Sequence, residues 1–415
     1  MKIRIIKLEE KSMKKFLALL LAAMMVVGLL AACGGSSSGG GESAAPASNG
    51  GEEGGSGNAV PEVLFFYSAI GDYGFGDQGY AACKNLESKY GMHMTLIEYG
   101  TDTSVAVTSL WDAVENGVPE TGNPYDYVVS TSWNGLYDTM VEQSANYPDT
   151  KFIVFDTGPD KVFDNPNVYG ISFAQNEGSF ATAVFEAYQS KTGVISTIAR
   201  SDSPILNDFC TGWIHGAKYA KSDLGLDVDY LFTYLGETSS SGTLETCSVI
   251  FNNTQFGAKT DIMYLIASDW ILSACQSAYE NGVEWTIGVD TDQWQALHDQ
   301  GIDDSSSHYM KIVTSMQKKI EESVDWTVAG ILDGSLAGGN HAATLANNGV
   351  GLADNENFQA QVSAETQAAV KAVLDSVASG AVDVHSYYDF TGDDFYEKYV
   401  NYYTDHEISF EEANG

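Results

Sequence analysis

VLFFYSAIGDYGFGDQGY, residues 63–80, is an apolar run followed by a glycine-rich loop that leads into a segment of helical spacing. The run Val63–Tyr67 has the length and the aromatic content of a buried strand. The loop Gly71–Tyr80 brings carboxylates and aromatic rings together just beyond that strand. The stretch therefore predicts a strand, a loop and a helix in succession, which is the repeating unit of parallel α/β sheets.

The same unit recurs along the chain. Further strands are expected at His93–Tyr99, Tyr127–Thr131, Phe152–Asp156, Val168–Phe173, Gly193–Ala199, Val228–Leu235, Asp261–Ala267, Trp285–Val289 and Lys311–Ser315. Helices are expected near 78–90, 104–116, 136–147, 176–190, 205–221, 243–255, 269–282 and 317–334. Because the pattern runs twice, before and after about residue 190, it predicts an α/β fold of two doubly wound parallel-sheet lobes joined by hinge crossovers.

The two lobes are expected to divide the chain as follows. The first lobe takes residues 60–174 and the second takes 175–289, each with part of 290–380, and 381–415 forms an aromatic, acidic C-terminal extension. That extension either completes a lobe by core packing or forms a separate partner surface. Hinge crossings are expected around 173–176 and 289–292, with a further crossing after Thr314. Ligands of such sheets bind beyond the carboxyl ends of the strands, so the cleft between the lobes is the predicted site.

The N-terminal residues predict export. Met13–Cys33 runs from two lysines through an apolar stretch to small residues and a cysteine, which is typical of a secretory signal. Its end, Leu30-Ala31-Ala32-Cys33, resembles the lipobox of bacterial lipoproteins, in which the cysteine receives the lipid. We therefore expect a signal peptide over 1–32 with translation starting at Met13, an acylated Cys33 that anchors the protein outside the cytoplasmic membrane, and a Gly/Ser-rich tether over 33–59. An uncleaved membrane anchor is the alternative.

Composition excludes several classes of function. The formal net charge of −36 excludes nucleic acid as a partner, because phosphate binding needs clustered Lys and Arg, and it is typical of a soluble domain at a crowded surface. Cys83, Cys210, Cys247 and Cys275 form no CxxC pair, so no zinc site is expected. A disulfide between Cys210 and Cys247 and buried free thiols both remain open.

Six collinear motifs resemble the basic membrane protein family, the substrate-binding lipoproteins that serve ABC transporters and bind nucleosides. The motifs are Asp72–Asp77, Tyr147–Asp156, Phe173–Phe180, Phe209–Ala217, Gly288–Gln293 and Thr314–Lys318. The resemblance covers roughly residues 60–380 and implies a type I periplasmic-binding-protein fold, a nucleoside ligand and an ABC permease as partner. No catalytic nucleophile or zinc motif stands out in the sequence, so we expect a monomer with neither enzymatic activity nor a cofactor. Gly74 and Gly76 replace the usual serine and asparagine, so one side-chain donor expected near the base is missing.

A nucleoside offers a flat base, base-edge groups and ribose hydroxyls, and each asks for a particular side chain. Aromatic rings suit the base, and Phe75 or Tyr80 from the first lobe and Phe209 from the second are the candidates, with Trp133 lining the same cleft. Carboxylates suit the donors of the sugar and the base, which favours Asp290 for the ribose and Asp77 from the opposite lobe. Lys318 would donate to a hydroxyl or to the ring oxygen.

Each of these residues also has a structural interpretation. Phe75 and Phe209 are equally typical of a core, Asp77 of a helix N-cap, and Lys318 of a solvated helix face. Asp290 and Asp292 could bind a cation, but too few oxygen ligands lie nearby in sequence for a metal site to be expected. The GxGxxG at Gly74–Gly79 has dinucleotide spacing, but Asp72 and Asp77 would repel a pyrophosphate.

Three other functions remain open. A sugar-binding protein of the same fold would use similar carboxylates and rings, a surface hydrolase could act on nucleosides or glycans with two carboxylates, and a ligand sensor would look the same as a transport protein in sequence.

Overall fold

The structure of the protein, a computed structural model, describes residues 60–236 and 239–389. The chain divides into two compact units, Met1–Gly57 and Asn58–Gly415, and the described residues lie in the second. The predicted signal peptide, Cys33 and the tether therefore lie outside the described residues, as does the C-terminal extension beyond residue 389.

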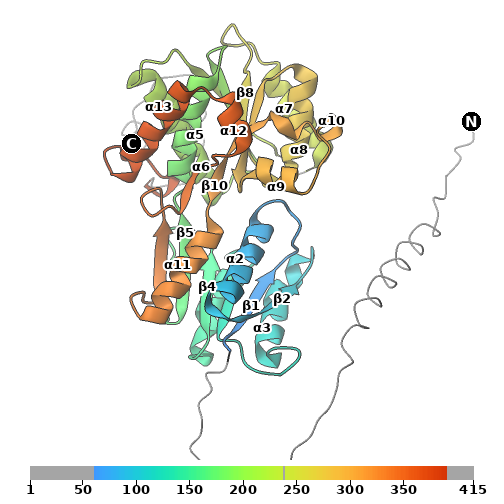
Figure 1. Cartoon of the computed structure of the whole chain (residues 1–415), viewed down its shortest axis with the longest axis vertical. Helices are drawn as coiled ribbons and strands as arrows, with labels where there is room; N and C mark the ends of the chain where they lie inside the picture. Colours follow the sequence, from blue (N-terminus) through green and yellow to red (C-terminus); the bar gives the residue numbers. More distant parts are fainter. Residues whose placement is uncertain (1–59, 237–238, 390–415) are drawn as a thin grey trace, which may run out of the picture. The chain divides into compact units, whose positions relative to one another are not determined.

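Two six-stranded sheets form the framework (Figure 1). Sheet A contains β1 (Glu62–Tyr67), β2 (His93–Glu98), β3 (Tyr127–Thr131), β4 (Lys151–Phe155), β5 (Val168–Phe173) and β11 (Gly339–Ala343), in the spatial order β11-β5-β4-β3-β1-β2. Sheet B contains β6 (Val194–Ala199), β7 (Asp229–Tyr234), β8 (Ile262–Ile266), β9 (Trp285–Asp290), β10 (Ile312–Lys318) and β12 (Val350–Leu352), in the order β12-β10-β9-β8-β6-β7. Each strand of sheet A thus has a counterpart at the same place in sheet B.

Helices cover both faces of each sheet, as the alternating pattern predicts. On sheet A, α3 (Ala106–Asn116) and α4 (Leu136–Gln143) share a packing cluster with one face, and α2 (Phe75–Tyr90) and α11 (Ile320–Asp333) pack on the other. On sheet B, one face carries α7 (Ser240–Phe251), α8 (Ile271–Asn281) and α9 (Gln293–Asp299), and the other carries α5 (Gln175–Gln189) and α6 (Pro204–Ser222). The remaining helices are α10 (Asp304–Ser307), α12 (Glu356–Gln361) and α13 (Ala364–Ala378), which packs on α5.

The residues of β1 show why the sheets are covered on both faces. All six are buried, and successive side chains of a strand point to opposite faces. Val63, Phe65 and Tyr67 belong to the cluster that contains α2, whereas Leu64 and Phe66 belong to the cluster that contains α3. Neighbouring strands run parallel, apart from the antiparallel pair β10 and β12. The predicted fold class, two doubly wound parallel-sheet lobes, is confirmed.

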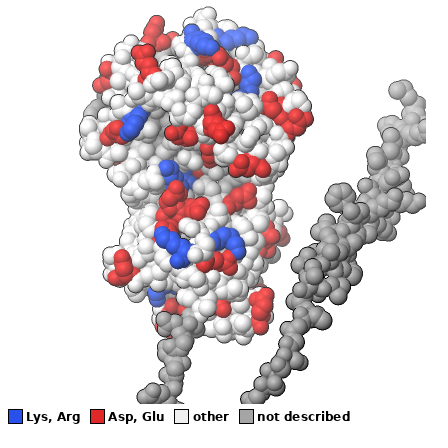
Figure 2. All heavy atoms as spheres, viewed as in Figure 1, with Lys and Arg blue, Asp and Glu red and all other residues white. Residues whose placement is uncertain are grey.

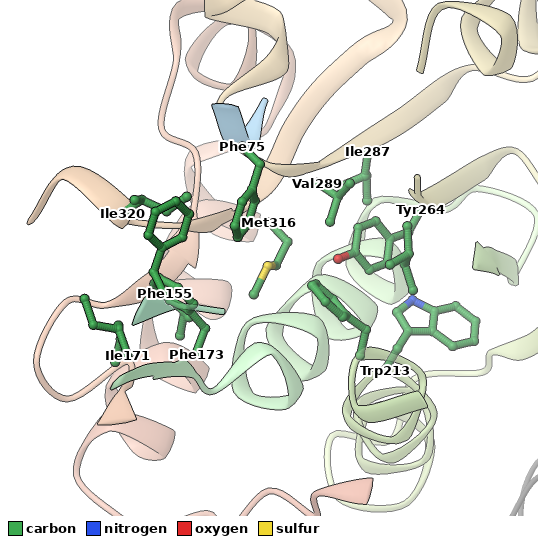
Figure 3. Packing of buried hydrophobic residues seen from close by; sticks show 14 of the residues in the cluster. Phe75, Phe155, Ile171, Phe173, Trp213, Tyr264, Ile287, Val289, Met316 and Ile320 are labelled. Atoms are coloured by element: carbon green, nitrogen blue, oxygen red, sulfur yellow. The ribbon is translucent and has the colours of Figure 1, made fainter. Parts of the chain in front are cut away.

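One packing cluster includes residues of both sheets. Phe155 and Phe173 end strands of sheet A, and Tyr264 and Met316 come from strands of sheet B (Figure 3). All four are buried and belong to the same cluster. The lobes therefore meet through apolar contact at the carboxyl ends of their strands, beside the predicted site.

The chain passes between the lobes three times. The passages lie between β5 and α5, between β10 and α11, and between β11 and β12. The first and second agree with the expected crossings around 173–176 and after Thr314. The crossing expected around 289–292 is wrong, because β9, α9 and β10 all belong to the second lobe and β9 pairs directly with β10.

Six of the α-helices and β-strands in the described residues have no counterpart among the sequence predictions, namely α9, α10, β11, β12, α12 and α13. The sequence of β11, Gly-Asn-His-Ala-Ala, has none of the large β-branched or aromatic residues that mark a strand. The helix predicted from residue 317 starts later, at Ile320, because β10 continues to Lys318. Lys318 therefore ends a strand and is not on a helix face.

The described part of the C-terminal extension packs against the second lobe. Oδ1 of Asp208, on α6, accepts hydrogen bonds from Oγ of Ser386 at 2.6 Å and from the backbone N–H of Tyr387 at 2.9 Å. The ring of His385 stacks on His215 with their centroids 4.2 Å apart. Burial raises the pKa of Asp208 to about 6. Residues up to 389 thus follow the core-packing interpretation.

The structure also distinguishes between a disulfide and free thiols. All four cysteines of the described residues are free and buried. Cys210 and Cys247 belong to clusters on opposite faces of sheet B, so the disulfide that the sequence left open does not form.

Candidate functional site

A cavity of about 280 Å³ lies where the strand ends of the two lobes meet. Its volume is just below the roughly 300–1,000 Å³ that is usual for small-molecule sites. Five of the predicted site residues line it, namely Phe75, Trp133, Phe209, Asp290 and Lys318. The other polar or aromatic lining residues are Tyr67, Ser68, Asp72, Asp156, Arg200, Ser268 and Asp269, and the apolar ones include Ile205, Leu206 and Ile266. Both lobes contribute, as the cleft prediction requires.

A buried ion pair joins the lobes at this cavity. Nζ of Lys318, at the end of β10, lies 2.6 Å from Oδ1 of Asp156, which directly follows β4. Their side chains are only 2% and 5% exposed. Nε1 of Trp133 donates to the second carboxylate oxygen of Asp156 at 2.9 Å. Both oxygens of Asp156 are therefore occupied, and its charge is compensated across the two sheets.

Aromatic rings surround the ammonium group of Lys318. Its Nζ lies 4.7 Å from the ring centroid of Phe209, 5.3 Å from that of Phe75 and 5.7 Å from that of Phe173. These distances are within the range of cation–π attraction. Phe75 and Phe209 also belong to the core cluster, so their core role and their position at the cavity coexist.

Asp290 ends β9, the counterpart of β4, but its carboxylate is not hydrogen-bonded in the way that the carboxylate of Asp156 is. No hydrogen bond from a residue of the described ranges reaches its carboxylate, although its backbone oxygen accepts one from Nε2 of Gln78 at 2.7 Å. Burial raises the pKa of Asp290 to about 7, and the charge of Asp156 adds to the effect while Lys318 opposes it. Asp290 thus faces the cavity with a carboxylate that has no fixed partner among residues 60–236 and 239–389.

Both aspartates adopt left-handed backbone conformations. The φ angles are 64° at Asp156 and 68° at Asp290, a region that residues other than glycine occupy uncommonly. Such outliers gather at functional sites, because the surrounding structure must hold them. Their repetition at counterpart strand ends directs both carboxylates to the same cleft.

Asp72 organises the loop that enters α2. Its carboxylate accepts hydrogen bonds from the backbone N–H groups of Gly74 at 3.0 Å, Gly76 at 2.8 Å and Asp77 at 3.2 Å. These are donors that a helix start leaves without intrahelical partners. Asp72 therefore performs the capping role that the sequence analysis considered for Asp77.

Asp77 and Tyr80 do not line the cavity. The carboxylate of Asp77 accepts from the N–H groups of Gly71 at 2.6 Å and Tyr73 at 3.0 Å, so it is committed to the loop. Tyr80 is partly buried against the core cluster. The structure gives both residues structural contacts, and neither joins the other five predicted residues in the lining of the cavity.

Close packing explains why position 76 is a glycine. A Cβ atom added there would lie 2.4 Å from Cε1 of Tyr67, so the ring of Tyr67 occupies the space that a side chain at position 76 would need. Similarly, a Cβ at Gly79 would lie 2.6 Å from Cζ of Phe65. These glycines allow α2 to approach β1 closely, which accounts for them without a bound dinucleotide.

A second ion pair lies at the mouth of the cavity. NH1 of Arg200, after β6, lies 3.0 Å from Oδ2 of Asp269, in the short 3-10 helix η3 (Ser268–Trp270) after β8. Both side chains are 44% exposed. The cavity thus contains a buried ion pair, Lys318 with Asp156, and an exposed ion pair at its mouth, Arg200 with Asp269.

Sequence reasoning missed Tyr67, Asp72, Asp156, Arg200 and Asp269 as lining residues. Asp156 carried a usable signal, because a charged residue that directly follows a buried strand lies at the edge where ligands bind. Arg200 and Asp269 also follow strands. Their pairing depends on strand order, since β6 and β8 are neighbours in space but not in the chain.

Across residues 60–236 and 239–389, no group of three or more His, Cys, Asp or Glu side chains is arranged to hold a metal ion. In the same part of the chain, no helix combines the length and the apolar character that crossing a bilayer requires. On the face of the molecule in Figure 2, Asp and Glu side chains are widely spread, with Lys and Arg between them.

Residues 60–381 match the model of the Bmp family, described as PnrA-like ABC transporter substrate-binding proteins. The match covers both sheets and ends before Val384 and His385, whose contacts with α5 and α6 hold the described part of the C-terminal extension.

Several relatives are similar at the level of sequence. The ABC transporter nucleoside-binding protein BmpA of Lactococcus lactis is 27% identical over 52% of this chain and 60% of its own length. An uncharacterized lipoprotein of Pyrococcus horikoshii is 27% identical over 70% of this chain and 68% of its own length. Basic membrane protein D of Borreliella burgdorferi is 25% identical over 60% of this chain and 68% of its own length.

Solved structures share the fold. A solute-binding protein of an ABC transporter system from Aeropyrum pernix superposes with a TM-score of 0.64 at 17% identity, over 82% of this chain and 97% of that one. A transcriptional activator of the comK gene from Bacillus halodurans superposes with a TM-score of 0.59 at 18% identity, over 78% of this chain and 100% of that one. At such identities the likeness concerns the fold alone.

Proposed function

Because the chain belongs to the PnrA-like family of ABC transporter substrate-binding proteins, we propose that it binds a nucleoside, of purine type, in the cavity between its lobes and presents it to a membrane permease. The observation that carries the proposal is the pairing of one committed carboxylate, Asp156, with one uncommitted carboxylate, Asp290, in a cavity walled by aromatic rings.

The polar groups of the cavity suit a ribose. An ionised carboxylate accepts hydrogen bonds at both oxygens, and a ribose supplies neighbouring hydroxyl donors. Asp290 takes these donors in the proposal, and Lys318 gives its remaining N–H groups to a hydroxyl or to the ring oxygen. Lys318 is already held in place by Asp156, so little side-chain entropy is lost when the ligand binds.

The apolar groups suit a base. Phe75, Trp133 and Phe209 line the cavity, and each aromatic pair that a base forms with them adds about 0.5–1.5 kcal/mol beyond the burial of area. Closure of the lobes would remove water and strengthen every polar contact inside.

The charge of the lining favours a nucleoside over a nucleotide. Four carboxylates, those of Asp72, Asp156, Asp269 and Asp290, face two cationic side chains. A phosphate would meet a net negative wall in a chain that is itself strongly acidic.

A thermal-shift panel of nucleosides, free bases, sugars and riboflavin tests the proposal. A nucleoside at 100 times its dissociation constant should stabilise the protein by about 2.7 kcal/mol. Asp290→Asn should lose most of that shift, whereas Asp112→Asn, a substitution on the exposed side of α3, should keep it. A shift with a sugar and none with any nucleoside would replace the proposal by the sugar-binding function.

Product analysis separates binding from catalysis. Incubation of the protein with inosine or adenosine should return the nucleoside intact. Release of free base would favour the hydrolase that the sequence left open.

We also propose that Cys33 carries the lipid that anchors the protein outside the cytoplasmic membrane. The proposal rests on the lipobox-like sequence and on the similarity to two proteins of Pyrococcus that are named as lipoproteins. Metabolic labelling with palmitate should mark the wild-type protein and a Ser36→Ala variant but not Cys33→Ser. Light scattering of the protein without its lipid should give the mass of a monomer.

A further inference from the structure

The ion pair at the cavity mouth has no evident structural task. Arg200 and Asp269 are each 44% exposed, and exposed pairs of this kind contribute only about 0–1 kcal/mol to stability. Both residues nevertheless line the cavity, together with Ile205 and Leu206. The pair therefore offers charged groups to a ligand at little cost to the fold.

The other charged groups of the cavity are already engaged or differently placed. Lys318 and Asp156 bind each other in the buried part, and Asp72 binds three backbone N–H groups. No donor side chain from the part of the chain that the structure describes is bound to the carboxylate of Asp290. Arg200 and Asp269 are thus the one place in the described cavity where a fork of donors and a pair of acceptors stand side by side and exposed.

The mouth pair lies within reach of the same ligand as the buried pair. The charge of Asp269 raises the pKa of both Asp290 and Tyr67, so the three groups are near one another. From the first lobe, a Cβ at Gly74 would lie 3.4 Å from Cβ of Ser268, the neighbour of Asp269. The loop before α2 therefore faces the mouth pair across the cleft.

We propose that Arg200 and Asp269 read the base edge of the ligand and select a 6-oxopurine nucleoside. This inference rests on the proposed nucleoside function. With the ribose at Asp290 and Lys318, the base extends toward the mouth. The guanidinium donates to O6 and N7, and the carboxylate accepts from N1–H and, in guanine, also from the 2-amino group. The two side chains then exchange their mutual contact for contacts with the ligand.

Adenine does not fit this arrangement. It carries an amino donor where a 6-oxopurine carries its oxygen, and a guanidinium has no acceptor to meet it. It also lacks a hydrogen on N1, so Asp269 loses its partner there. Sites built to hydrogen-bond a group discriminate strongly against analogues that leave the site's polar groups unpaired.

Calorimetric titration of the wild-type protein with guanosine, inosine, adenosine and uridine tests the inference. We expect guanosine to bind at least about tenfold more tightly than adenosine, since a bidentate arginine contact to guanine is worth about that factor in discrimination. Inosine should lie between them, because it lacks the 2-amino donor.

Two variants keep the local shape and remove the reading groups. Arg200→Lys keeps the charge and loses the fork, and Asp269→Asn replaces one acceptor by a donor. Each should reduce the guanosine to adenosine preference to within about threefold, with little change in adenosine affinity. The matched control is Asp229→Asn, which removes the carboxylate of another exposed ion pair. In that pair the side chain of Asp229 is 41% exposed and that of Lys221 is 47% exposed. This control should leave all four affinities unchanged.

The outcomes separate the two proposals. Equal binding of guanosine and adenosine by the wild-type protein, or an equal loss of all nucleosides in both variants, would overturn the reading role and leave nucleoside binding intact. Absence of binding to any nucleoside would overturn the proposed function itself.

Discussion

Asp156 and Asp290 end counterpart strands of the two sheets and share a left-handed backbone, yet their carboxylates are in different states. Asp156 receives an ammonium and an indole N–H, whereas Asp290 has no hydrogen bond to its carboxylate from the described residues. The cause lies one strand away. β10 ends in Lys318, and its counterpart β5 ends in Phe173, so only one of the two lobes supplies a cation.

The difference shows how a repeated architecture produces an asymmetric site. The backbone delivers two carboxylates to the cleft, and Lys318 from the second lobe neutralises the carboxylate of Asp156 from the first. Nζ of Lys318 also lies 5.7 Å from the ring centroid of Phe173, so the two residues that break the symmetry contact each other.

The substitution with the largest expected effect on stability is Lys318→Met. It leaves Asp156 buried without its cation, and removal of one partner of a buried pair destabilises a protein by about 3–5 kcal/mol. Chemical denaturation should show this loss in the free energy of unfolding, and the double variant Lys318→Met with Asp156→Asn should recover part of it.

Lys319→Met is the control for that variant. Nζ of Lys319 donates to Oδ1 of Asn348 at 2.6 Å in an exposed position, so its loss should cost less than about 0.5 kcal/mol. If both lysine variants unfold at the same denaturant concentration, the buried pair does not have the role described.

Asp290→Asn tests the difference between the two aspartates through the pH dependence of stability. The raised pKa of Asp290, about 7, means that the folded protein holds a proton that the unfolded chain, with its carboxyl pKa of about 3.9, has released. Stability from this group is therefore present below about pH 4 and is lost as the pH rises to 7. We expect denaturation curves of the wild type to lose about 2 kcal/mol more than Asp290→Asn over this range, less than full linkage because Asp290 is partly exposed.

The pKa of Asp208 is also raised, to about 6, so this residue contributes a pH dependence of the same sign. Asp208 is present in both the wild type and the variant, so the difference between their pH profiles isolates the contribution of Asp290. Parallel profiles would mean that Asp290 ionises as readily in the folded state as in the unfolded one.

The smallest change is Trp133→Phe, which makes Asp156 more like Asp290. It removes the indole donor at 2.9 Å from Oδ2, and a hydrogen bond to a charged group contributes about 1.5–3 kcal/mol. We expect a loss near the lower value in thermal unfolding. Trp294→Phe removes an indole of equal size whose N–H reaches only the sulfur of Met310, at 3.2 Å, and should cost clearly less beyond the shared loss of packing.

The sequence predicted the sheets better than the site. Runs such as Tyr127–Thr131 and Val168–Phe173 coincide with β3 and β5, because fully buried strands read as continuous apolar segments. β11 and α13 were missed, since their stability comes from packing on β5 and α5 and not from their own residues.

The cavity residues divide in the same way. Phe75, Trp133, Phe209, Asp290 and Lys318 follow or flank predicted strand ends, so local position was sufficient to place them at the cavity. Asp77 was a misleading candidate, because which of two nearby carboxylates caps α2 depends on loop geometry that the residue types do not specify. Arg200 and Asp269 required the spatial order of strands.

The three passages between the lobes have a consequence for how the chain is made. A ribosome releases the N-terminus first, yet sheet A takes its last strand from Gly339–Ala343 and sheet B from Val350–Leu352. Until then β5 and β10 are open edges, which are prone to pair with other chains, and pairing over so long a separation in sequence is slow. Sheet A cannot be completed before Gly339–Ala343 has been synthesised, nor sheet B before Val350–Leu352, so a factor that holds the polypeptide unfolded for export has most of the length of synthesis in which to bind.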